Sequence, residues 1–408
     1  MTSLADAVLP LIRTRAELHR WGAANAHGKQ MHDAIDTLES ALPETDPGEA
    51  YQVAHKALAS AITVIARADD SSGIIGDGCR RLLALHPRLA AAASVPASKL
   101  LPWMIRFQFD GDVDYFELDP VAYAAALGDT GIAGYRSRLD EIRGQLSPEP
   151  GSLVSHDPDR HARWVLEWND RRLAVLDRDV DEVIRTHARD RKVAAWLHQT
   201  AEALEEIGET DLAVDWARQA VDFDRGHQSL RASEYWCKLL GTHRPGELLD
   251  ARVYVFRRWP SALTASRLHT AVGAAWPEYE DEVLDALAPR PSDAVTFTLT
   301  TLKDPARAWR LAHDLGLDSL HAWSELVKAY ERVDPLAALP VHRQLVESTL
   351  IHAGAAHYRD AAHRLARMRR IATGTEQADT VDAFIAELRD THRRRPRLQQ
   401  EFDRAQLP

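Results

Sequence analysis

Apolar residues recur along most of the chain with the spacing of an α-helix. They stand at positions i, i+3, i+4 and i+7, and alanine, leucine, arginine and glutamate fill many of the positions between them. One such stripe consists of Val381, Phe384, Ile385 and Leu388, and another of Tyr358, Ala361, Ala362, Leu365 and Met368. This period predicts an all-α protein whose helices are about 10–20 residues long.

Short breaks separate the apolar stripes, and several of them contain aspartate followed by proline. Examples are Asp119-Pro120, Asp304-Pro305 and Asp334-Pro335. Aspartate can cap the first turn of a helix, and proline is favoured at the first helical position because its missing N–H is not needed there. Helices joined by short connections predict antiparallel helical hairpins.

The clearest interruption is Gly144–Arg160, which contains Pro148, Pro150 and Pro158 and has no apolar period. We therefore expect an N-terminal helical module at residues 1–146, a linker at 147–160 and a longer helical array at 161–408. One segment, Val295–Leu299, alternates apolar and polar residues as a strand does. It has no partner strand among the helical patterns around it, so we favour a helix there.

The segment Ala195–Arg225 has the spacing of a known helical repeat. Its small and apolar positions are Leu197, Ala201, Leu204, Gly208, Ala213, Ala217 and Ala220, and they resemble the 34-residue tetratricopeptide repeat. Small residues let two helices approach closely, and Gly208 stands at the turn, where a positive φ is needed. The pattern predicts a helical-hairpin array, a tetratricopeptide-like α-solenoid following the N-terminal helical module.

If this register is right, the first helix of the hairpin presents a polar face to a binding groove. That face consists of His198, Glu202, Glu205 and Glu206. Its carboxylates would prefer a basic or polar segment of a protein or peptide partner. We therefore expect these residues to form the partner-binding groove.

Several patches of the chain together resemble one kind of helical protein. They are Ala68–Asp77 with Leu82, Leu85 and His86, then Leu127–Arg136, Tyr358–Ala362, Leu388-Arg389 and His392–Pro396. With the repeat region, they are similar to the helical regions of bacterial SWIM zinc-finger proteins and of a related uncharacterised bacterial helical family. The resemblance implies an accessory helical scaffold, with a MoxR-type ATPase or a von Willebrand A-domain protein as candidate partners.

The zinc motif of the SWIM proteins is absent from this chain. That motif is Cys-x-Cys followed by Cys-x-His, whereas Cys79 and Cys237 are isolated and are the only cysteines in the sequence. The zinc and the nucleic-acid contact that it implies are therefore not carried over. We expect no metal and no cofactor.

The charge of the chain argues against nucleic acid as its main partner. The chain has 50 lysines and arginines and 61 aspartates and glutamates, which gives a formal net charge of −11. A protein whose main partner is nucleic acid needs a positive field to bind phosphate groups. The N-terminus lacks the pattern of a signal peptide, no stretch is apolar enough to cross a membrane, and two lone cysteines suit a reducing compartment. These features predict a cytoplasmic protein with no membrane partner.

Two acidic loops raise the question of a cation site. Asp69, Asp70 and Asp77 lie in a Gly/Ser-rich loop, where we favour helix capping by Ser71 or Ser72 over a cation. The run Asp110–Asp114 resembles the start of a calcium loop, but the glycine and glutamate that an EF-hand needs are replaced by Tyr115 and Val121. Both loops stay open as possible cation sites.

Other chemically active side chains have simpler explanations. Cys79 and His86 are seven residues apart, about 10 Å along a helix, which disfavours a direct dyad and leaves Cys79 as a small buried residue. Three further groups have ordinary structural explanations. We expect surface or core histidines at His352, His357 and His363, packed tryptophans at Trp164 and Trp168, and solvated arginines at His392–Arg397.

The common motifs for phosphate binding, serine hydrolysis and zinc proteolysis are missing from the sequence. The leading hypothesis is therefore a non-enzymatic helical-repeat scaffold that mediates protein–protein interaction. The alternatives are a nucleic-acid-associated accessory factor related to SWIM proteins and an unrecognised hydrolase.

Overall fold

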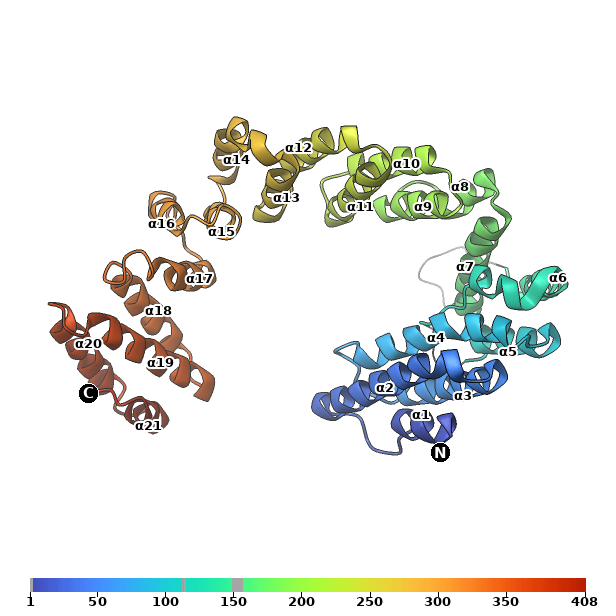
Figure 1. Cartoon of the computed structure of the whole chain (residues 1–408), viewed down its shortest axis with the longest axis horizontal. Helices are drawn as coiled ribbons and strands as arrows, with labels where there is room; N and C mark the ends of the chain where they lie inside the picture. The colour runs from blue at the N-terminus through green and yellow to red at the C-terminus, as the bar shows by residue number, and fades with distance from the viewer. Residues whose placement is uncertain (1–2, 112, 114, 149–156) are drawn as a thin grey trace. The chain divides into compact units, whose positions relative to one another are not determined.

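The computed structural model describes residues 3–111, 113, 115–148 and 157–408. Within these residues every regular element is a helix and there is no β-strand (Figure 1). The prediction of an all-α protein is confirmed. None of the helices in this part of the chain is long and apolar enough to cross a membrane.

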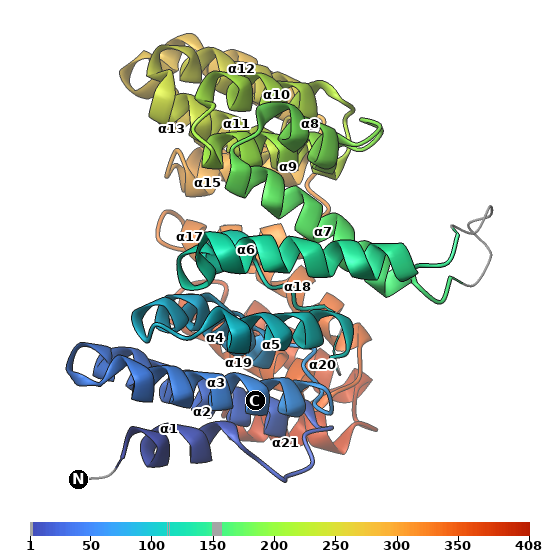
Figure 2. The ribbon, with the colours of Figure 1, turned by 90° about the vertical axis from the view of Figure 1, so that its right-hand side faces the viewer.

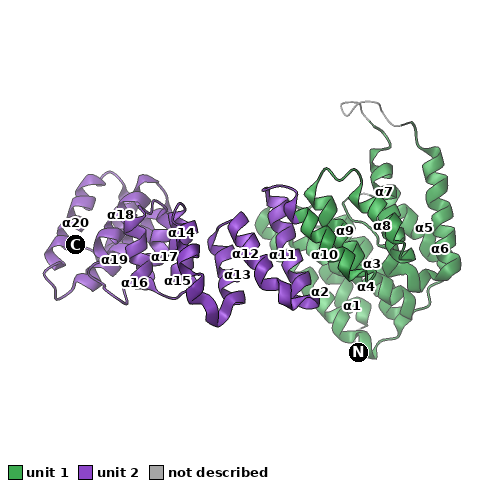
Figure 3. Ribbon diagram, turned by 90° about the horizontal axis from the view of Figure 1, so that it is seen from above, with its two compact units in different colours: residues 1–220 green, residues 221–408 purple. Residues whose placement is uncertain are grey.

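The chain divides into two compact units, residues 1–220 and residues 221–408, and the division falls inside α10 (Figure 3). The first unit contains α1 (Leu4–Ile12), α2 (Trp21–Ala41), α3 (Pro47–Ile65), α4 (Ile74–Ala92), α5 (Ala97–Phe109), α6 (Pro120–Gln145), α7 (Arg160–Asp177), α8 (Val180–Ala188), α9 (Ala194–Glu206) and nearly all of α10 (Thr210–Asp222). The second unit contains α11 (His227–His243), α12 (Leu248–Arg258), α13 (Ala262–Val272), α14 (Glu280–Leu287), α15 (Pro291–Thr300), α16 (Pro305–Asp314), α17 (Leu320–Tyr330), α18 (Leu339–Ile351), α19 (Ala355–Ala372), α20 (Ala378–Thr391) and α21 (Pro396–Arg404).

The first helices of unit 1 lie in successive layers (Figure 2). α1 packs on α2 and α3, and α4 packs on α2, α3 and α6. A glycine permits the closest of these approaches, because a Cβ atom on Gly28 of α2 would lie 2.4 Å from Cγ2 of Ile74 at the start of α4. The apolar faces meet in a core whose members include Met31, Ile35, Leu58, Ile75 and Leu82.

A buried polar network joins α5, α6 and α7. Gln108 Nε2 donates to Tyr135 Oη at 2.6 Å, and Tyr135 Oη donates to Asn169 Oδ1 at 2.8 Å. Asn169 Nδ2 donates to the backbone oxygen of Val165 at 2.9 Å. These three side chains are buried, and their mutual hydrogen bonds remove the cost of leaving polar groups unsatisfied inside the protein.

The predicted linker at 147–160 falls between α6 and α7, and its residues 149–156 lie outside the described part of the chain. The two helices pack against each other within unit 1, and Leu139 of α6 shares a hydrophobic cluster with Leu166 and Leu173 of α7. The compact units divide at Ala220 instead. The boundaries 1–146 and 161–408 stay a prediction about which parts of the chain fold on their own.

Two of the three Asp-Pro pairs begin helices as predicted. Asp119 accepts a hydrogen bond from the N–H of Val121 at 2.9 Å at the start of α6, and Asp304 accepts one from the N–H of Arg307 at 2.8 Å at the start of α16. Asp334 caps a turn instead, and α18 begins only at Leu339. The expectation for Asp334-Pro335 was therefore wrong.

The segment Val295–Leu299 lies in α15, so the choice of a helix is confirmed. Ala294, Val295, Phe297 and Thr298 are its buried residues, which is a helical and not an alternating set. The hydroxyl of Thr298 donates to the backbone oxygen of Ala294 at 2.9 Å, one turn earlier. Burial on one helical face thus overrides the β-propensity of the segment.

The hairpin of α9 and α10 has the burial that its sequence predicts. Ala201, Ala213 and Ala220 are each 0 % exposed, and Gly208 adopts a φ of +90° in the turn between the helices. Any residue with a side chain would be strained at that φ. The expectations for the turn and for the close-packed alanines are confirmed.

Unit 2 contains three hydrophobic clusters that follow one another along the chain. One includes Phe256 and Phe297, the next is centred on Leu326, and the last includes Leu365 and Phe402. α15 contributes to the first two clusters and α18 to the last two. The core of unit 2 is thus assembled from helices that are near neighbours in sequence.

The packing of α10 leads to a first prediction. Replacing Ala213 with leucine adds three carbon atoms at a fully buried position, and overpacking of this kind costs roughly 1–3 kcal/mol of unfolding free energy. Thermal or urea denaturation of the variant measures the loss. Glu202→Ala on the neighbouring helix is the control, and it should stay within about 0.5 kcal/mol of the parent. Equal stability of Ala213→Leu and the parent would show that this contact is loose.

Candidate functional site

The predicted groove face lies on α9 in unit 1. Glu202 is well exposed, with 55 % of its side chain accessible, whereas His198 is mostly buried, with 13 % accessible. Nε2 of His198 lies 3.5 Å from Oε1 of Glu202, one helical turn away. Glu205 is half-buried, and Glu206 is exposed at the end of the helix. The four residues share one side of α9, but only the carboxylates reach the surface.

Glu206 is held by a charged contact within unit 1. Arg172 of α7, whose side chain is 11 % exposed, lies 2.7 Å from Oε1 of Glu206 and 2.8 Å from Oδ2 of Asp119. The hydrogen bond from Arg172 lowers the pKa of Glu206. This carboxylate therefore ties α9 to α7 and, through Arg172, to Asp119 at the start of α6, whereas the side chain of Glu202 is more exposed, at 55 % against 42 % for Glu206.

An apolar pocket of about 450 Å³ lies in unit 2 between α18, α19 and α20. Its floor is formed by buried core residues, Leu339, Met368, Val381 and Phe384. Leu336 stands at its rim with 39 % of its surface exposed, which is unusual for a large apolar residue beside such a floor. The pocket offers an apolar surface that the protein itself leaves uncovered.

Charged residues surround this apolar floor. Arg343 also lines the pocket, and its guanidinium carbon lies 4.4 Å from the centre of the Phe384 ring. It is paired with Glu347 at 3.0 Å and Glu387 at 3.6 Å, while Glu376 lines the other side of the pocket. The pocket is therefore lined by one guanidinium, Arg343, which two carboxylates already pair, and by one carboxylate, Glu376.

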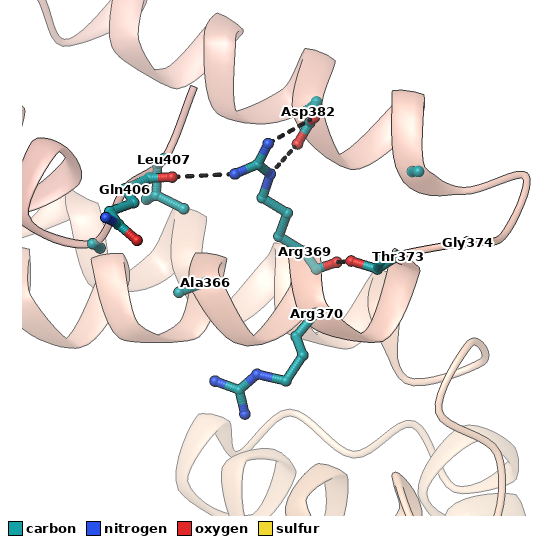
Figure 4. Close-up of a pocket in the computed structure, with 10 residues that line it drawn as sticks. Ala366, Arg369, Arg370, Thr373, Gly374, Asp382, Gln406 and Leu407 are labelled. Carbon is teal, nitrogen blue, oxygen red and sulfur yellow. Dashed lines mark hydrogen bonds and ion pairs between the residues drawn. The ribbon is translucent and has the colours of Figure 1, made fainter.

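A second pocket of about 440 Å³ lies between α19, α20 and residues 405–407 (Figure 4). Its main cation, Arg369, is held by Asp382 at 2.8 Å and by the backbone oxygen of Gln406 at 3.1 Å. Arg370 points to the opposite side of α19. The charges that line this pocket are thus used within the protein, and the apolar pocket is the stronger candidate for a binding site.

No sequence pattern predicts either pocket as a whole, because each forms where separate helices meet. A partial signal existed for the apolar pocket in the segment Val333–Ala337, which places two large apolar residues beside an Asp-Pro turn. Both of these residues, Val333 and Leu336, are exposed. Sequence reasoning treated this segment as a helix start and missed them.

A cluster of aromatic and histidine side chains is buried in unit 1. His86 of α4 is 0 % exposed, and each of its ring nitrogens has a partner: His55 Nδ1 at 2.9 Å and Tyr123 Oη at 2.9 Å. Its ring stacks on that of Trp103 with centroids 4.4 Å apart. Burial, reinforced by the charge that His55 can carry, lowers the pKa of His86 to about 3. His86 is therefore a neutral structural residue near pH 7.

Cys79 takes no part in this cluster. It is fully buried, as expected, and burial raises the pKa of its thiol to about 12, so it is not a nucleophile near neutral pH. The partners of His86 were missed in the sequence because His55 and Tyr123 come from other helices.

The first acidic loop is a helix cap, as favoured, and Asp70 contributes more to it than the expected serines. Asp70 accepts hydrogen bonds from the N–H groups of Ile75 and Gly76 at 2.9 and 2.8 Å, and Ser72 Oγ accepts a longer one from the N–H of Ile74 at 3.5 Å. A carboxylate can accept two N–H groups at once, which a serine hydroxyl does less well. Within the described residues, no group of three or more His, Cys, Asp or Glu side chains could hold a metal ion.

The second acidic loop, Asp110–Asp114, includes residues 112 and 114, which lie outside the described residues. The remaining candidates are dispersed. The rings of His352 and His357 lie 5.7 Å apart, and His363 is exposed on α19. Among the tryptophans, Trp168 donates to the backbone oxygen of Leu118 at 3.1 Å, which is a packing role.

The arginine run at the end of α20 is only partly solvated. Arg393, Arg394 and Arg397 are exposed, as expected. Arg395 donates instead to the backbone oxygen of Leu350 at 2.7 Å and lies over the Tyr358 ring. One of the four arginines is therefore used to hold α18, α19 and the start of α21 together.

The model of a family described as a family of unknown function (DUF6880) matches residues 8–398 of the chain. No curated protein matches the sequence of the chain.

The buried histidine cluster leads to a second prediction. A histidine whose pKa is about 3 in the folded protein and 6.5 when exposed stabilises the fold above pH 6.5 and loses that contribution as the pH falls toward 3. Between pH 7 and pH 4, the free energy of unfolding of the parent should therefore fall by up to roughly 3 kcal/mol more than that of His86→Gln. Urea denaturation at both pH values measures this, with His363→Gln as the control. An unchanged pH dependence in His86→Gln would contradict the assignment.

Proposed function

The chain belongs to this family of unknown function, and from its own residues we propose that it is a helical scaffold for protein–protein interaction. The observation that carries the proposal is the apolar pocket between α18, α19 and α20, with Leu336 exposed at its rim. A partner would insert one apolar side chain into this pocket. Such an anchor in a small pocket is how a few residues supply most of the binding free energy at many interfaces.

The charges around the pocket define the partner further. Arg343 is already paired with Glu347 and Glu387, and Glu376 is the carboxylate that lines the pocket, so an apolar side chain flanked by lysine or arginine fits both the floor and the rim. Burial of a leucine-sized side chain contributes about 1.5–3 kcal/mol. An anchor of this size supports a reversible contact with a short peptide segment.

The exposed carboxylate of Glu202 on α9 supports the same partner chemistry in unit 1. Under this proposal the face of His198, Glu202, Glu205 and Glu206 is a second contact surface, and it favours a basic or polar segment. We also propose that the helical hairpins are arranged as a tetratricopeptide-like α-solenoid. Successive clusters built from neighbouring helices, as in unit 2, are typical of such arrays.

We also propose that the protein acts in the cytoplasm. Cys79 and Cys237 are free and buried, which suits the reducing cytoplasm. MoxR-type ATPases and von Willebrand A-domain proteins, which the sequence resemblance suggests, are the candidate partners to test first.

The proposal is tested with a peptide library displayed against the full chain. We expect enrichment of peptides that have one large apolar residue flanked by lysine or arginine. Leu336→Glu should weaken the binding of an enriched peptide at least tenfold, because it places a carboxylate at the mouth of the apolar floor. The matched control is Leu320→Glu, which makes the same change in unit 2 at a leucine of similar exposure, 41 % against 39 %, outside the pocket.

Two outcomes would overturn the proposal. One is a library in which no apolar and basic peptide is enriched. The other is an enriched peptide that binds Leu336→Glu and the parent equally well. Both variants change exposed residues and should melt within about 0.5 kcal/mol of the parent, so a loss of binding is not a loss of folding.

A further inference from the structure

A strongly basic run of residues joins α20 to α21 in unit 2. It occupies residues 392–397, and four of these six residues are arginines. A hollow of about 440 Å³ opens at this connection and is lined by residues 390–395, among which Asp390 is the one carboxylate. In a chain with a formal net charge of −11, the run is a local concentration of positive charge.

The protein itself neutralises little of this charge. Arg393 has only a long ion pair, with Asp390 at 3.8 Å, and the two side chains are 72 % and 84 % exposed. Arg394 and Arg397 are exposed, and neither forms an ion pair with any residue that the structure describes. Three of the four guanidinium groups are therefore open to a negatively charged ligand from outside.

The carboxylates of α21 are engaged elsewhere. Glu401 lies 2.7 Å from Arg404, and Asp403 lies 2.8 Å from Arg389. The first turn of α21 contains no acidic residue but does contain Arg397. A cation in the first turn of a helix is opposed by the positive end of the helix dipole. Stabilisation of α21 therefore does not explain why an arginine stands at this position.

The run is fixed in place beside an exposed apolar residue. Arg395 donates to the backbone oxygen of Leu350 at 2.7 Å, at the end of α18, and lies over the ring of Tyr358 near the start of α19. Ile351 follows Leu350 directly and is 73 % exposed, the largest exposed fraction of any large apolar residue in the described part of the chain. A positively charged turn and an uncovered apolar side chain thus lie side by side.

This surface is separate from the apolar pocket. The pocket is lined by the first halves of α18 and α20 and by Met368 in the second half of α19. The basic run follows the end of α20, and through Arg395 it contacts the end of α18 and the start of α19. The pocket and the run therefore lie at opposite ends of the same three helices, which are found in Figure 1 at the C-terminal end of unit 2.

We propose that Ile351, Arg393, Arg394 and Arg397 form a basic surface that binds an acidic segment of a partner protein. Carboxylates of the segment pair with the guanidinium groups in the planar, two-bond geometry that arginine offers. An apolar residue within the segment covers Ile351, which would otherwise remain in water.

A nucleic acid fits this surface less well than an acidic segment of a protein. The net charge of −11 repels a long polyanion more strongly than a segment with a few carboxylates. The exposed apolar residue of the surface is aliphatic, whereas single-stranded bases stack on aromatic rings. The inference does not rest on the proposed function, because the basic surface excludes the apolar pocket and prefers the opposite charge in its partner.

The experiment measures the binding of a fluorescein-labelled peptide, Ser-Glu-Glu-Leu-Glu-Glu-Ser, to the full chain by fluorescence anisotropy. In about 50 mM salt, where exposed charges are weakly screened, we expect saturable binding. The double variant Arg394→Glu with Arg397→Glu should bind the peptide at least tenfold more weakly, because each reversal replaces attraction by repulsion. Its melting temperature should equal or exceed that of the parent, since the reversals separate like charges and favour the start of α21.

Three control variants make the result specific to the basic surface. Arg290→Glu with Arg310→Glu makes the same change of charge at two exposed arginines of unit 2 outside the surface, and it should weaken binding less than threefold. Ile351→Ser should weaken binding of the leucine peptide but not of the same peptide with serine in place of leucine. Leu336→Glu alters the apolar pocket and should leave the affinity for the acidic peptide unchanged, so that this inference and the proposed function succeed or fail separately.

The inference fails on any one of four results. The parent shows no saturable binding of the acidic peptide, or the two double variants lose affinity equally, which would make binding a property of overall charge. The double variant of Arg394 and Arg397 melts several degrees below the parent, which would make the run structural. A labelled oligothymidine binds more tightly than the peptide at equal ionic strength and is released by the same double variant, which would make the surface a nucleic-acid site.

Discussion

The structure depends on one constraint: each helix buries its apolar stripe against helices that lie close to it in sequence. In unit 2, α15 and α18 each belong to two successive hydrophobic clusters. In unit 1, Gly28 brings α2 close to the start of α4, and the alanines Ala201, Ala213 and Ala220 of α9 and α10 are fully buried. Cores of this kind are built up one hairpin after another, and side chains at the junctions between helices are left to form pockets.

Local patterns could be predicted from the sequence because local contacts produce them. The positive φ of Gly208, the burial of Ala213 and the helix at Val295–Leu299 follow from spacing and turn chemistry within a few residues. The candidate site could be predicted only in part. Glu202 is exposed as expected, but the role of Glu206 is set by Arg172, which lies on another helix. The apolar pocket requires three helices to meet, and no spacing in the sequence encodes that meeting.

Polar groups in the core of unit 1 are completed by other side chains of the same unit. The nitrogens of His86 and the hydroxyl of Tyr135 have partners within unit 1, so these groups stabilise the fold and need no ligand. In unit 2 the floor of the pocket between α18, α19 and α20 is apolar and uncovered, which is typical of a contact surface for another protein.

The most direct test of the local origin of the cores is hydrogen exchange, followed by mass spectrometry, in the parent and in Ala213→Leu. The account predicts that the variant loses protection in α9, α10 and the helices packed on them, while residues 339–407, which hold the last cluster of unit 2, exchange as in the parent. An equal loss of protection throughout the chain would contradict it, because stability would then be shared by a single cooperative core.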